Sequence, residues 1–395
     1  MSYSSLYKIF VSNDHSTFEK IYQNRMLSES TIKLNLLINN YPAFIFLHSE
    51  IINLLYKIRE MDKKVEIAFN KLPDVAKIQF VKMSLIQEIE MTHFIEGVIS
   101  TKKEINDILE DVESKNENVN RIKGIVNKYR FLLAHSNPLI SNSLSVRELY
   151  NEVLIMEIDK SDFPDGVLFR KGTVNIYKNA SKLIHIGITP ESKIIEHLEE
   201  SIKLLNDENI DMLIRVAAFH YLFGYIHPFY DGNGRINRLI SSYYLSRNLS
   251  SIVSYRISMT IKENYSQYLK AFEETNDIRN RGDIGTFVYS FLELIYKSLE
   301  TTEMYAKVKK NELDNYKYII SQKNLSKNEC KLLFLLVQCT LFSEFGLSVS
   351  ELGKILNKSD NTIRTIVNGL IKKGYVSMGY IGKRKFYSAK LENIK

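Results

Sequence analysis

The sequence predicts a mainly α-helical protein with one β-hairpin near its middle and a small module of helices and a hairpin at its C-terminal end. Three observations carry this prediction. Apolar residues recur at helical spacing over residues 17–130 and again over 189–244. Before residue 325, strand-like composition gathers only on either side of Lys171-Gly172. From residue 325 onward, two short helical patterns precede a second hairpin pattern.

Composition places the chain among ordinary globular proteins. Its 395 residues, of which 45% are hydrophobic and 25% charged, suggest two or three domains. Two cysteines, Cys330 and Cys339, are too few for a disulfide framework or a cysteine-rich zinc site. No apolar run approaches the roughly 20 residues of a membrane helix, and the N-terminus lacks a signal-peptide pattern. We therefore expect a soluble, cytoplasmic protein.

Four parts are expected along the chain: an N-terminal helical region, a core, a linker and a C-terminal module. Their expected bounds are 1–143, 144–299, 300–324 and 325–391.

The expected core begins with a helix over residues 146–156. After the strand-like stretch, Thr189-Pro190-Glu191 offers a helix start, because proline fits the first helical position. Another apolar helix spans 208–226 and breaks at Pro228. The next helix begins near Gly234, so the sequence here reads as helix, tight loop, helix.

The loop between these two helices, His227-Pro-Phe-Tyr-Asp-Gly-Asn-Gly-Arg-Ile-Asn-Arg238, has the features of a phosphate site. Gly232 and Gly234 let the backbone turn sharply and approach a ligand closely. The helix that follows exposes free N–H groups and the positive end of its dipole. A Gly-Asn-Gly stretch is also an ordinary turn signal.

Four side chains in the same loop suit nucleotide chemistry. Arg235 and Arg238 are three residues apart, so they share a helix face and can reach phosphate oxygens. Asp231 is the only carboxylate of the loop and suits Mg²⁺, and His227 suits a general base. Taken singly, a histidine at a helix end is usually structural and two helical arginines are usually solvated. Their combination in twelve residues favours the functional interpretation.

These residues resemble the signature of the Fic (Fido-domain) family, H-x-F-x-[DE]-G-N-G-R-x-x-R, at every specified position. The resemblance extends over residues 80–300 and implies a helical core with one β-hairpin. It implies transfer of AMP from ATP to a hydroxyl of a target protein, with His227 as base and Asp231 as the Mg²⁺ ligand. The resemblance also implies that phosphates are held by Gly232, Asn233, Gly234, Arg235 and Arg238.

A second segment, residues 92–97 (Thr-His-Phe-Ile-Glu-Gly), resembles the inhibitory motif [ST]-x-x-x-E-[GN] of the same family. Thr92 and Glu96 are about one helical turn apart, on a helix expected over about 84–97. The resemblance implies that Glu96 pairs with Arg238 and blocks the γ-phosphate position. The alternative is a surface glutamate near a helix end.

The strand-like stretches are 167–169 and 173–177, and residues 169–177 resemble the family's flap, which docks the target by strand addition. The docking residues implied are Thr173, Val174, Asn175 and Ile176. An ordinary exposed hairpin is the alternative. Tyr265 lies where family members add a nucleotide contact, although a core tyrosine fits equally.

The C-terminal module resembles a winged helix-turn-helix, with a second helix over 360–373 and a hairpin flanking 381–384. Residues 325–395 hold twelve Lys or Arg and five Asp or Glu, an excess equal to the net charge of +7 of the whole chain. DNA contacts are therefore expected from Arg364, Lys383, Arg384 and Lys385. A protein-docking module and a solvated lysine-rich surface are the alternatives.

The function expected from the sequence is a protein adenylyltransferase that uses ATP and Mg²⁺ and is inhibited by its own Glu96. The expected partner is a protein with a Ser, Thr or Tyr hydroxyl; self-modification, a homodimer and DNA are further options, and no membrane partner is expected. Alternative functions are a DNA-binding regulator with a Fic domain as sensor, and a Fic enzyme that uses another nucleotide or removes AMP.

Overall fold

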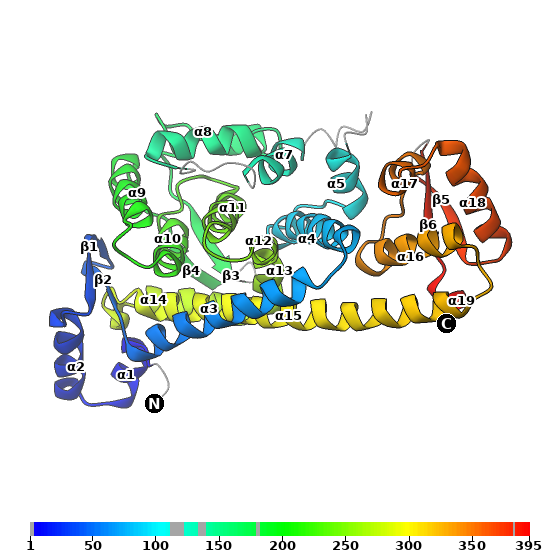
Figure 1. Ribbon diagram of the computed structural model, residues 1–395. Coiled ribbons are helices and arrows are strands. Elements are labelled where there is room, and N and C mark those ends of the chain that lie inside the picture. Colours follow the sequence, from blue (N-terminus) through cyan, green and yellow to red (C-terminus); the bar gives the residue numbers. More distant parts are fainter. Residues whose placement is uncertain (1–3, 111–121, 133–139, 179–181, 382–383) are drawn as a thin grey trace. The chain divides into compact units, whose positions relative to one another are not determined.

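The computed structural model describes residues 4–110, 122–132, 140–178, 182–381 and 384–395 (Figure 1). It divides into two compact units. Unit 1 comprises Met1–Asp62 and Ile86–Leu299, and unit 2 comprises Lys63–Leu85 and Glu300–Lys395.

Helix α10 (Met212–Ile226) is the centre of unit 1 because it is apolar on every side. All its residues except Arg215 and Gly224 are buried, which is typical of a helix packed on its whole circumference. Helices α9 (Glu191–Asn206) and α11 (Asn233–Leu245) pack against it. The helix, loop, helix expected around residues 208–244 is therefore present, and it forms the core.

The remaining helices of unit 1 surround this core (Figure 1). They are α3 (Ser49–Asn70), α4 (Asp74–Ile95), α5 (Lys102–Leu109), α7 (Lys123–Leu132), α8 (Ser143–Leu154), α12 (Ser251–Ser254), α13 (Ile257–Glu263), α14 (Tyr265–Asn276) and α15 (Gly285–Gln322), with 3-10 turns at Lys160–Asp162 and Ile278–Asn280. Of these, α3, α4 and α15 contribute residues to both units.

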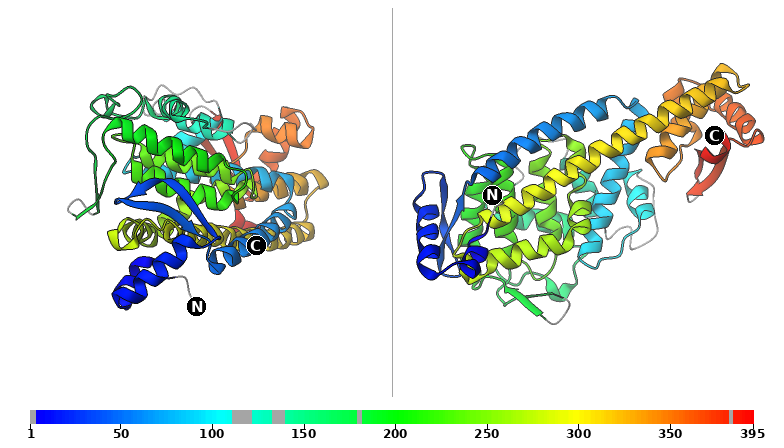
Figure 2. Two further views of the ribbon diagram at one scale, coloured as in Figure 1. Left: turned by 90° about the vertical axis from the view of Figure 1, so that its left-hand side faces the viewer. Right: turned by 90° about the horizontal axis from the view of Figure 1, so that it is seen from below.

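A β-hairpin lies in the N-terminal region, where the sequence analysis expected only helices. Strands β1 (Thr31–Ile38) and β2 (Tyr41–Phe46) pair antiparallel. Their turn is Asn39-Asn40, with φ of 49° and 67°, a conformation that asparagine tolerates and that two-residue hairpins need. The hairpin lies with α1 (Leu6–Ser12) and α2 (His15–Leu27) at one end of unit 1 (Figure 2).

The middle hairpin is present but displaced along the sequence. Its strands are β3 (Asn175–Lys178) and β4 (Lys182–Ile186), so the expectation of a strand at 167–169 was wrong. Backbone N–H groups of residues 167–169 instead donate to the carboxylate of Glu191, the first residue of α9. This carboxylate holds the segment out of any sheet.

Two helix bounds also differ from expectation. Helix α4 begins at Asp74 and ends at Ile95, so it is longer than the expected 84–97 and Glu96 lies just beyond its end. Residues 300–322, expected as part of a linker, continue α15 without a break. Leu313, Tyr316 and Ile320 are buried in this stretch, which explains why it is helical rather than open.

In unit 2, helices α16 (Lys327–Phe342), α17 (Val349–Leu356) and α18 (Asp360–Lys372) precede the antiparallel strands β5 (Val376–Ile381) and β6 (Arg384–Ala389). A short helix, α19 (Leu391–Ile394), follows. Ser326, Ser348 and Ser359 cap the three helices with their hydroxyls. The assignment to the winged-helix class stays a prediction.

Among the helices that the structure describes, none is both long enough and apolar enough for a membrane crossing.

Candidate active site

The loop between α10 and α11 is built by two left-handed residues. His227 ends α10 with φ of 53° and donates its backbone N–H to Phe223 O at 2.9 Å. Gly232 precedes α11 with φ of 84°, and a Cβ there would lie 2.6 Å from Cδ1 of Leu154. Glycine is therefore required at 232 for both conformation and space.

The side chain of Asn233 fastens this loop. Its Oδ1 accepts from Phe229 N at 3.0 Å and its Nδ2 donates to Phe229 O at 2.8 Å. Phe229 itself stacks on Tyr150 with ring centroids 3.8 Å apart. The amide of Asn233 thus holds the loop, and a phosphate would meet backbone N–H groups at the start of α11 instead. These groups precede the first intrahelical bond, which Ile236 donates to Gly232.

Arg235 lies between two carboxylates. It is 1% exposed, and its Nη atoms contact Oε2 of Glu157 at 2.7 Å and Oδ2 of Asp231 at 2.8 Å. Burial opposes its charge, but Asp231 and Glu157 raise the pKa of Arg235 overall. Arg235, which was expected to bind a phosphate, therefore binds Asp231 in this structure and orients its carboxylate.

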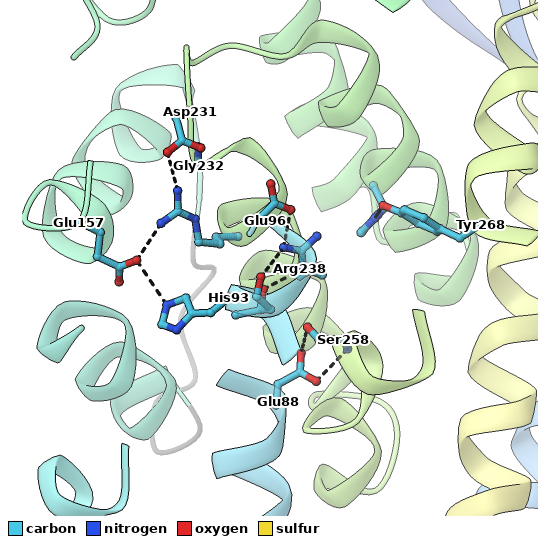
Figure 3. Close-up of polar contacts among 12 residues, drawn as sticks. Glu88, His93, Glu96, Glu157, Asp231, Gly232, Arg238, Ser258 and Tyr268 are labelled. Atoms are coloured by element: carbon cyan, nitrogen blue, oxygen red, sulfur yellow. Dashed lines mark hydrogen bonds and ion pairs between the residues drawn. The ribbon is translucent and has the colours of Figure 1, made fainter. Parts of the chain in front are cut away.

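Arg238 is held by the end of α4. It is 2% exposed; Nε donates to Thr92 Oγ1 at 2.8 Å, and Nη2 donates to Thr92 O at 3.0 Å and to Glu96 Oε1 at 2.7 Å. Figure 3 shows the Glu96 carboxylate directed at Arg238. The structure thus brings Thr92 and Glu96 into contact with Arg238, although Thr92 and Arg238 are 146 positions apart in the sequence.

The Glu96 carboxylate also covers the start of α11. A Cβ on Gly234 would collide with this carboxylate, so the two groups are in close approach. An anion at a helix N-terminus is stabilised by free N–H groups and the helix dipole. Glu96 therefore occupies a position that suits an anion, and a phosphate would compete for it.

His227 lies at the rim of a cavity of about 180 Å³. Its Nδ1 is 3.3 Å from Gly224 O, and burial lowers the pKa of the imidazole to about 4. The ring is therefore neutral near pH 7 and can accept a proton.

The cavity has a polar side and an apolar side. The polar side includes Glu96, His227, Asn233, Gly234 and Arg238, and the apolar side includes Ile176, Ile184, Tyr265, Tyr268 and Phe272. This combination suits a planar base next to phosphates. Its volume is below the roughly 300–1,000 Å³ of ordinary small-molecule sites, in keeping with the presence of Glu96 in it.

The structure adds site residues that the sequence analysis missed. Glu88 is fully buried on α4; it accepts from Ser258 N at 2.8 Å and from Ser258 Oγ at 2.6 Å. Burial raises the pKa of Glu88 to about 7, although the Ser258 bonds oppose the shift. Glu88 lies four residues before Thr92, so it shares a helix face with the motif, which is the one signal the sequence offered.

Glu157 and His93 are two further missed residues, both fully buried in their side chains. His93 Nε2 is 3.3 Å from Glu157 Oε2, the same oxygen that meets Arg235. Figure 3 shows the line of contacts from His93 through Glu157 toward Asp231. The end of α4 thus reaches both arginines of the loop, Arg238 directly and Arg235 through Glu157.

The four residues expected to dock the target lie in strand β3 or directly before it. Asn175 and Ile176 lie in β3, Thr173 and Val174 precede it, and Ile176 lines the cavity. Tyr265 begins α14, is 40% exposed and also lines the cavity. Contact of these residues with a target or a nucleotide stays a prediction.

Of the residues expected to contact DNA, Arg364, Arg384 and Lys385 belong to the described part of unit 2. Arg364 is exposed on α18, 3.9 Å from the Asp360 carboxylate. Arg384 and Lys385 are exposed at the start of β6. Lys383 lies outside the described residues.

A magnesium ion is implied by the family resemblance, and the residues present fit it. Asp231 is an oxygen ligand with 44% of its side chain exposed. Within the ranges that the structure describes, no three His, Cys, Asp or Glu side chains cluster as a complete metal site. A single carboxylate suits Mg²⁺, which takes its other ligands from water and substrate phosphates.

Comparison with known proteins gives a family for this site. A family model described as Fic/DOC family matches residues 145–245. Protein adenylyltransferase fic-1 of Caenorhabditis elegans is 31% identical over 124 residues, which are 28% of this chain and 24% of that protein. A probable protein adenylyltransferase of Aquifex aeolicus, aq_aa38, is 35% identical over 74 residues, 19% of this chain and 21% of that protein. The chain thus matches about a quarter or less of the length of these curated relatives.

A solved structure shows the same fold over a longer stretch. A Fic family protein from Desulfovibrio desulfuricans superposes with a TM-score of 0.52 over 87% of this chain and 97% of that one, at 16% identity. Residues 145–245, which include the loop from His227 to Arg238, thus form a Fic/DOC domain, and the mainly helical fold is that of a solved Fic family protein.

Proposed function

We propose that the protein is an adenylyltransferase that transfers AMP from ATP to a protein hydroxyl and that Glu96 holds it in a restrained state. The observation that carries the proposal is the contact of Arg238 with Glu96 at 2.7 Å, at the N-terminus of α11. The names of the two relatives support the activity. The anion-binding geometry supports a polyphosphate substrate.

The proposed chemical step assigns a role to each of these side chains. The neutral imidazole of His227 takes the proton of the target hydroxyl, and the hydroxyl oxygen forms a bond to the α-phosphorus. The bond from that phosphorus to the β-phosphate oxygen breaks, and pyrophosphate leaves. The backbone N–H groups at the start of α11 and the Arg238 guanidinium stabilise the charge on the phosphates.

Asp231 would hold the magnesium ion, which supplies positive charge to the phosphate oxygens when bound. Arg235 keeps the Asp231 carboxylate in place through their 2.8 Å contact. The apolar wall with Tyr265 and Tyr268 would receive the base. The hairpin β3–β4 would place the target segment, because a short edge strand accepts another strand.

Restraint by Glu96 follows from competition for one guanidinium. While Glu96 accepts from Arg238, the γ-phosphate lacks its cation and meets a like charge instead. Release of Glu96 would free both Arg238 and the start of α11. Binding of ATP in a productive pose is therefore coupled to displacement of Glu96.

The test is direct. The Glu96→Gly variant is incubated with Mg²⁺, ATP and a cell lysate, and modified peptides are identified by mass spectrometry. We expect an adenylate group on Ser, Thr or Tyr side chains, on the protein itself or on lysate proteins. A variant that binds ATP but leaves every peptide unmodified would contradict the proposal, and modification by another nucleotide would correct the substrate. Loss of AMP from a previously modified target would identify removal as the activity.

A further inference from the structure

Arg170 is a buried arginine whose charge has no ionic partner among the described residues. The residue is fully buried, and every nitrogen of its guanidinium donates to a backbone carbonyl. Nε donates to His227 O at 2.8 Å, Nη1 to Gly172 O at 2.5 Å, and Nη2 to Ile188 O at 3.0 Å and to Ile226 O at 3.3 Å. A buried cation is costly unless its donors are satisfied. Here four backbone carbonyls satisfy it, and two of them, from Ile226 and His227, lie at the negative end of α10.

These carbonyls belong to two functional elements. Gly172 precedes strand β3 and Ile188 follows strand β4, so they are the two ends of the hairpin. Ile226 ends α10, and His227 is the proposed base. A single guanidinium therefore ties the hairpin to the residue that would take the proton.

The surrounding backbone is fitted to this guanidinium. Arg170 N donates to Pro228 O at 3.2 Å, and Ile188 N donates to Ile226 O at 3.1 Å. A Cβ on Gly187 would collide with the Arg170 guanidinium and lie 3.2 Å from Cβ of His227. Glycine at 187 thus leaves the room that the arginine occupies.

We propose that Arg170 is a positioning residue that fixes the left-handed backbone of His227 and the ends of the β3–β4 hairpin in one arrangement, so that the base and the target strand keep a constant separation. The proposal rests on the proposed function of His227 and of the hairpin. Its physical basis is that a shift of about 1 Å between reacting groups can cost roughly a hundredfold in rate.

The charge of Arg170 has a second effect, on the protonation of His227. Among the described residues, the charged and titratable groups around this imidazole are Glu96, Arg170, His185, Arg238, Tyr265 and Tyr268. Burial lowers the pKa of His227 most; Arg170 and His185 lower it further, and Glu96 raises it. Loss of the Arg170 charge therefore raises the pKa of His227 and shifts the acid limb of activity to higher pH.

The experiment compares three variants in the full chain, each in the Glu96→Gly background so that transfer is measurable. Arg170→Gln removes the charge and most of the bonds, and Arg170→Lys keeps the charge with a shorter reach. The matched control is Arg147→Gln, because Arg147 donates to Leu168 O at 3.0 Å, two residues from Arg170 and away from His227. The measurements are the ATP dissociation constant, kcat against pH, and the titration of His227 by NMR.

For Arg170→Gln we expect ATP binding within about twofold of the parent, kcat lower by roughly a hundredfold, and a higher pKa of His227. For Arg170→Lys we expect an unchanged titration of His227 and a kcat between that of the parent and that of Arg170→Gln. The control should match the parent in all three measurements. The proposal is overturned if folded Arg170→Gln behaves as the control does, or if Arg170→Lys has the parent's kcat.

The outcomes separate this proposal from the proposed function. If the parent transfers no AMP, the proposed function fails, but the NMR titration of His227 still tests the contact with Arg170. An unchanged titration in Arg170→Gln would then overturn the electrostatic part without any activity assay. If Arg170→Gln does not fold, Arg170→Lys decides through its kcat.

Discussion

Arg238 donates to Glu96 Oε1 at 2.7 Å and to Thr92 at two atoms, so two residues at and just beyond the end of α4 hold one buried guanidinium. The relationship means that the site cannot offer Arg238 to a phosphate without first losing the carboxylate of Glu96. Breaking a buried ion pair leaves a costly unpaired charge. We therefore expect Glu96 to leave Arg238 only when a phosphate takes its place.

Replacement of Glu96 by glycine should raise transfer of AMP. The carboxylate that competes with phosphate is gone, and we expect a rise of about 5- to 150-fold, the usual range of coupling energies. Labelling with ATP in a time course measures it. Asp74→Asn, an exposed carboxylate at the other end of α4, is the control and should change nothing. Equal labelling by both variants and the parent would refute restraint by Glu96.

Replacement of Thr92 by valine should weaken the hold on Arg238. Valine keeps the shape of threonine but leaves Nε of a buried guanidinium without its 2.8 Å acceptor. We expect a loss of about 1.5–3 kcal/mol in the free energy of unfolding, measured in urea, with a rise in labelling. Thr260→Val, which loses a hydroxyl bond to the backbone of its own helix, should cost about 1 kcal/mol and leave labelling unchanged. An equal rise in labelling by both variants would show that lower stability of the fold, and not release of Arg238, causes the rise.

Glu88 should make folding stability depend on pH. Its pKa is raised from 4.5 to about 7 by burial, so between these values the folded state binds a proton that the unfolded chain has lost. Stability contributed by this residue is present below about pH 4.5 and is lost as pH rises to 7, by roughly 3 kcal/mol. Urea unfolding of the parent and of Glu88→Gln from pH 4 to 8 checks this. The variant should lose that dependence; parallel curves would show that Glu88 does not titrate in this way.

The positive charge of residues 325–395, in unit 2, should let the protein bind duplex DNA at low salt. In the full chain, Lys385→Gln should reduce the salt slope of binding by about 0.9, the value for one phosphate. Arg364→Gln, on α18, should reduce sequence preference more than the slope. Lys20→Gln, exposed on α2 in unit 1, is the control. Fluorescence anisotropy without any binding at low salt would leave protein docking as the role of this unit.

The active-site loop could be predicted from the sequence because its chemistry is local. Gly232, Asp231 and the two arginines lie within a few residues of one another, and turn, helix start and spacing follow from that short stretch. The inhibitory segment could be found through its motif. Its partner Arg238 was named only by family resemblance, since nothing in local sequence links positions 142 residues apart.

The other elements depended on tertiary contacts that the sequence does not display. Arg170 reads as a surface arginine in a loop, and only the folded chain shows that four carbonyls surround it. Glu157 and His93 are ordinary polar residues in the sequence, and only the fold places Glu157 on Arg235 and His93 on Glu157. The N-terminal hairpin was missed because apolar residues of β1 and β2 also fit a helical pattern, although Asn39-Asn40 was an available turn signal.

The measurement that tests the account most directly is transfer of label from ATP by Glu96→Gly and by the double variant Glu96→Gly with His227→Ala. ATP carries the label in its α-phosphate in one reaction and in its γ-phosphate in the other, and ATP binding is measured in parallel. We predict that Glu96→Gly places the α-label on protein and never the γ-label, and that the double variant binds ATP nearly as well but transfers neither. Transfer of the γ-label, or transfer of the α-label at the same rate without His227, would contradict the account.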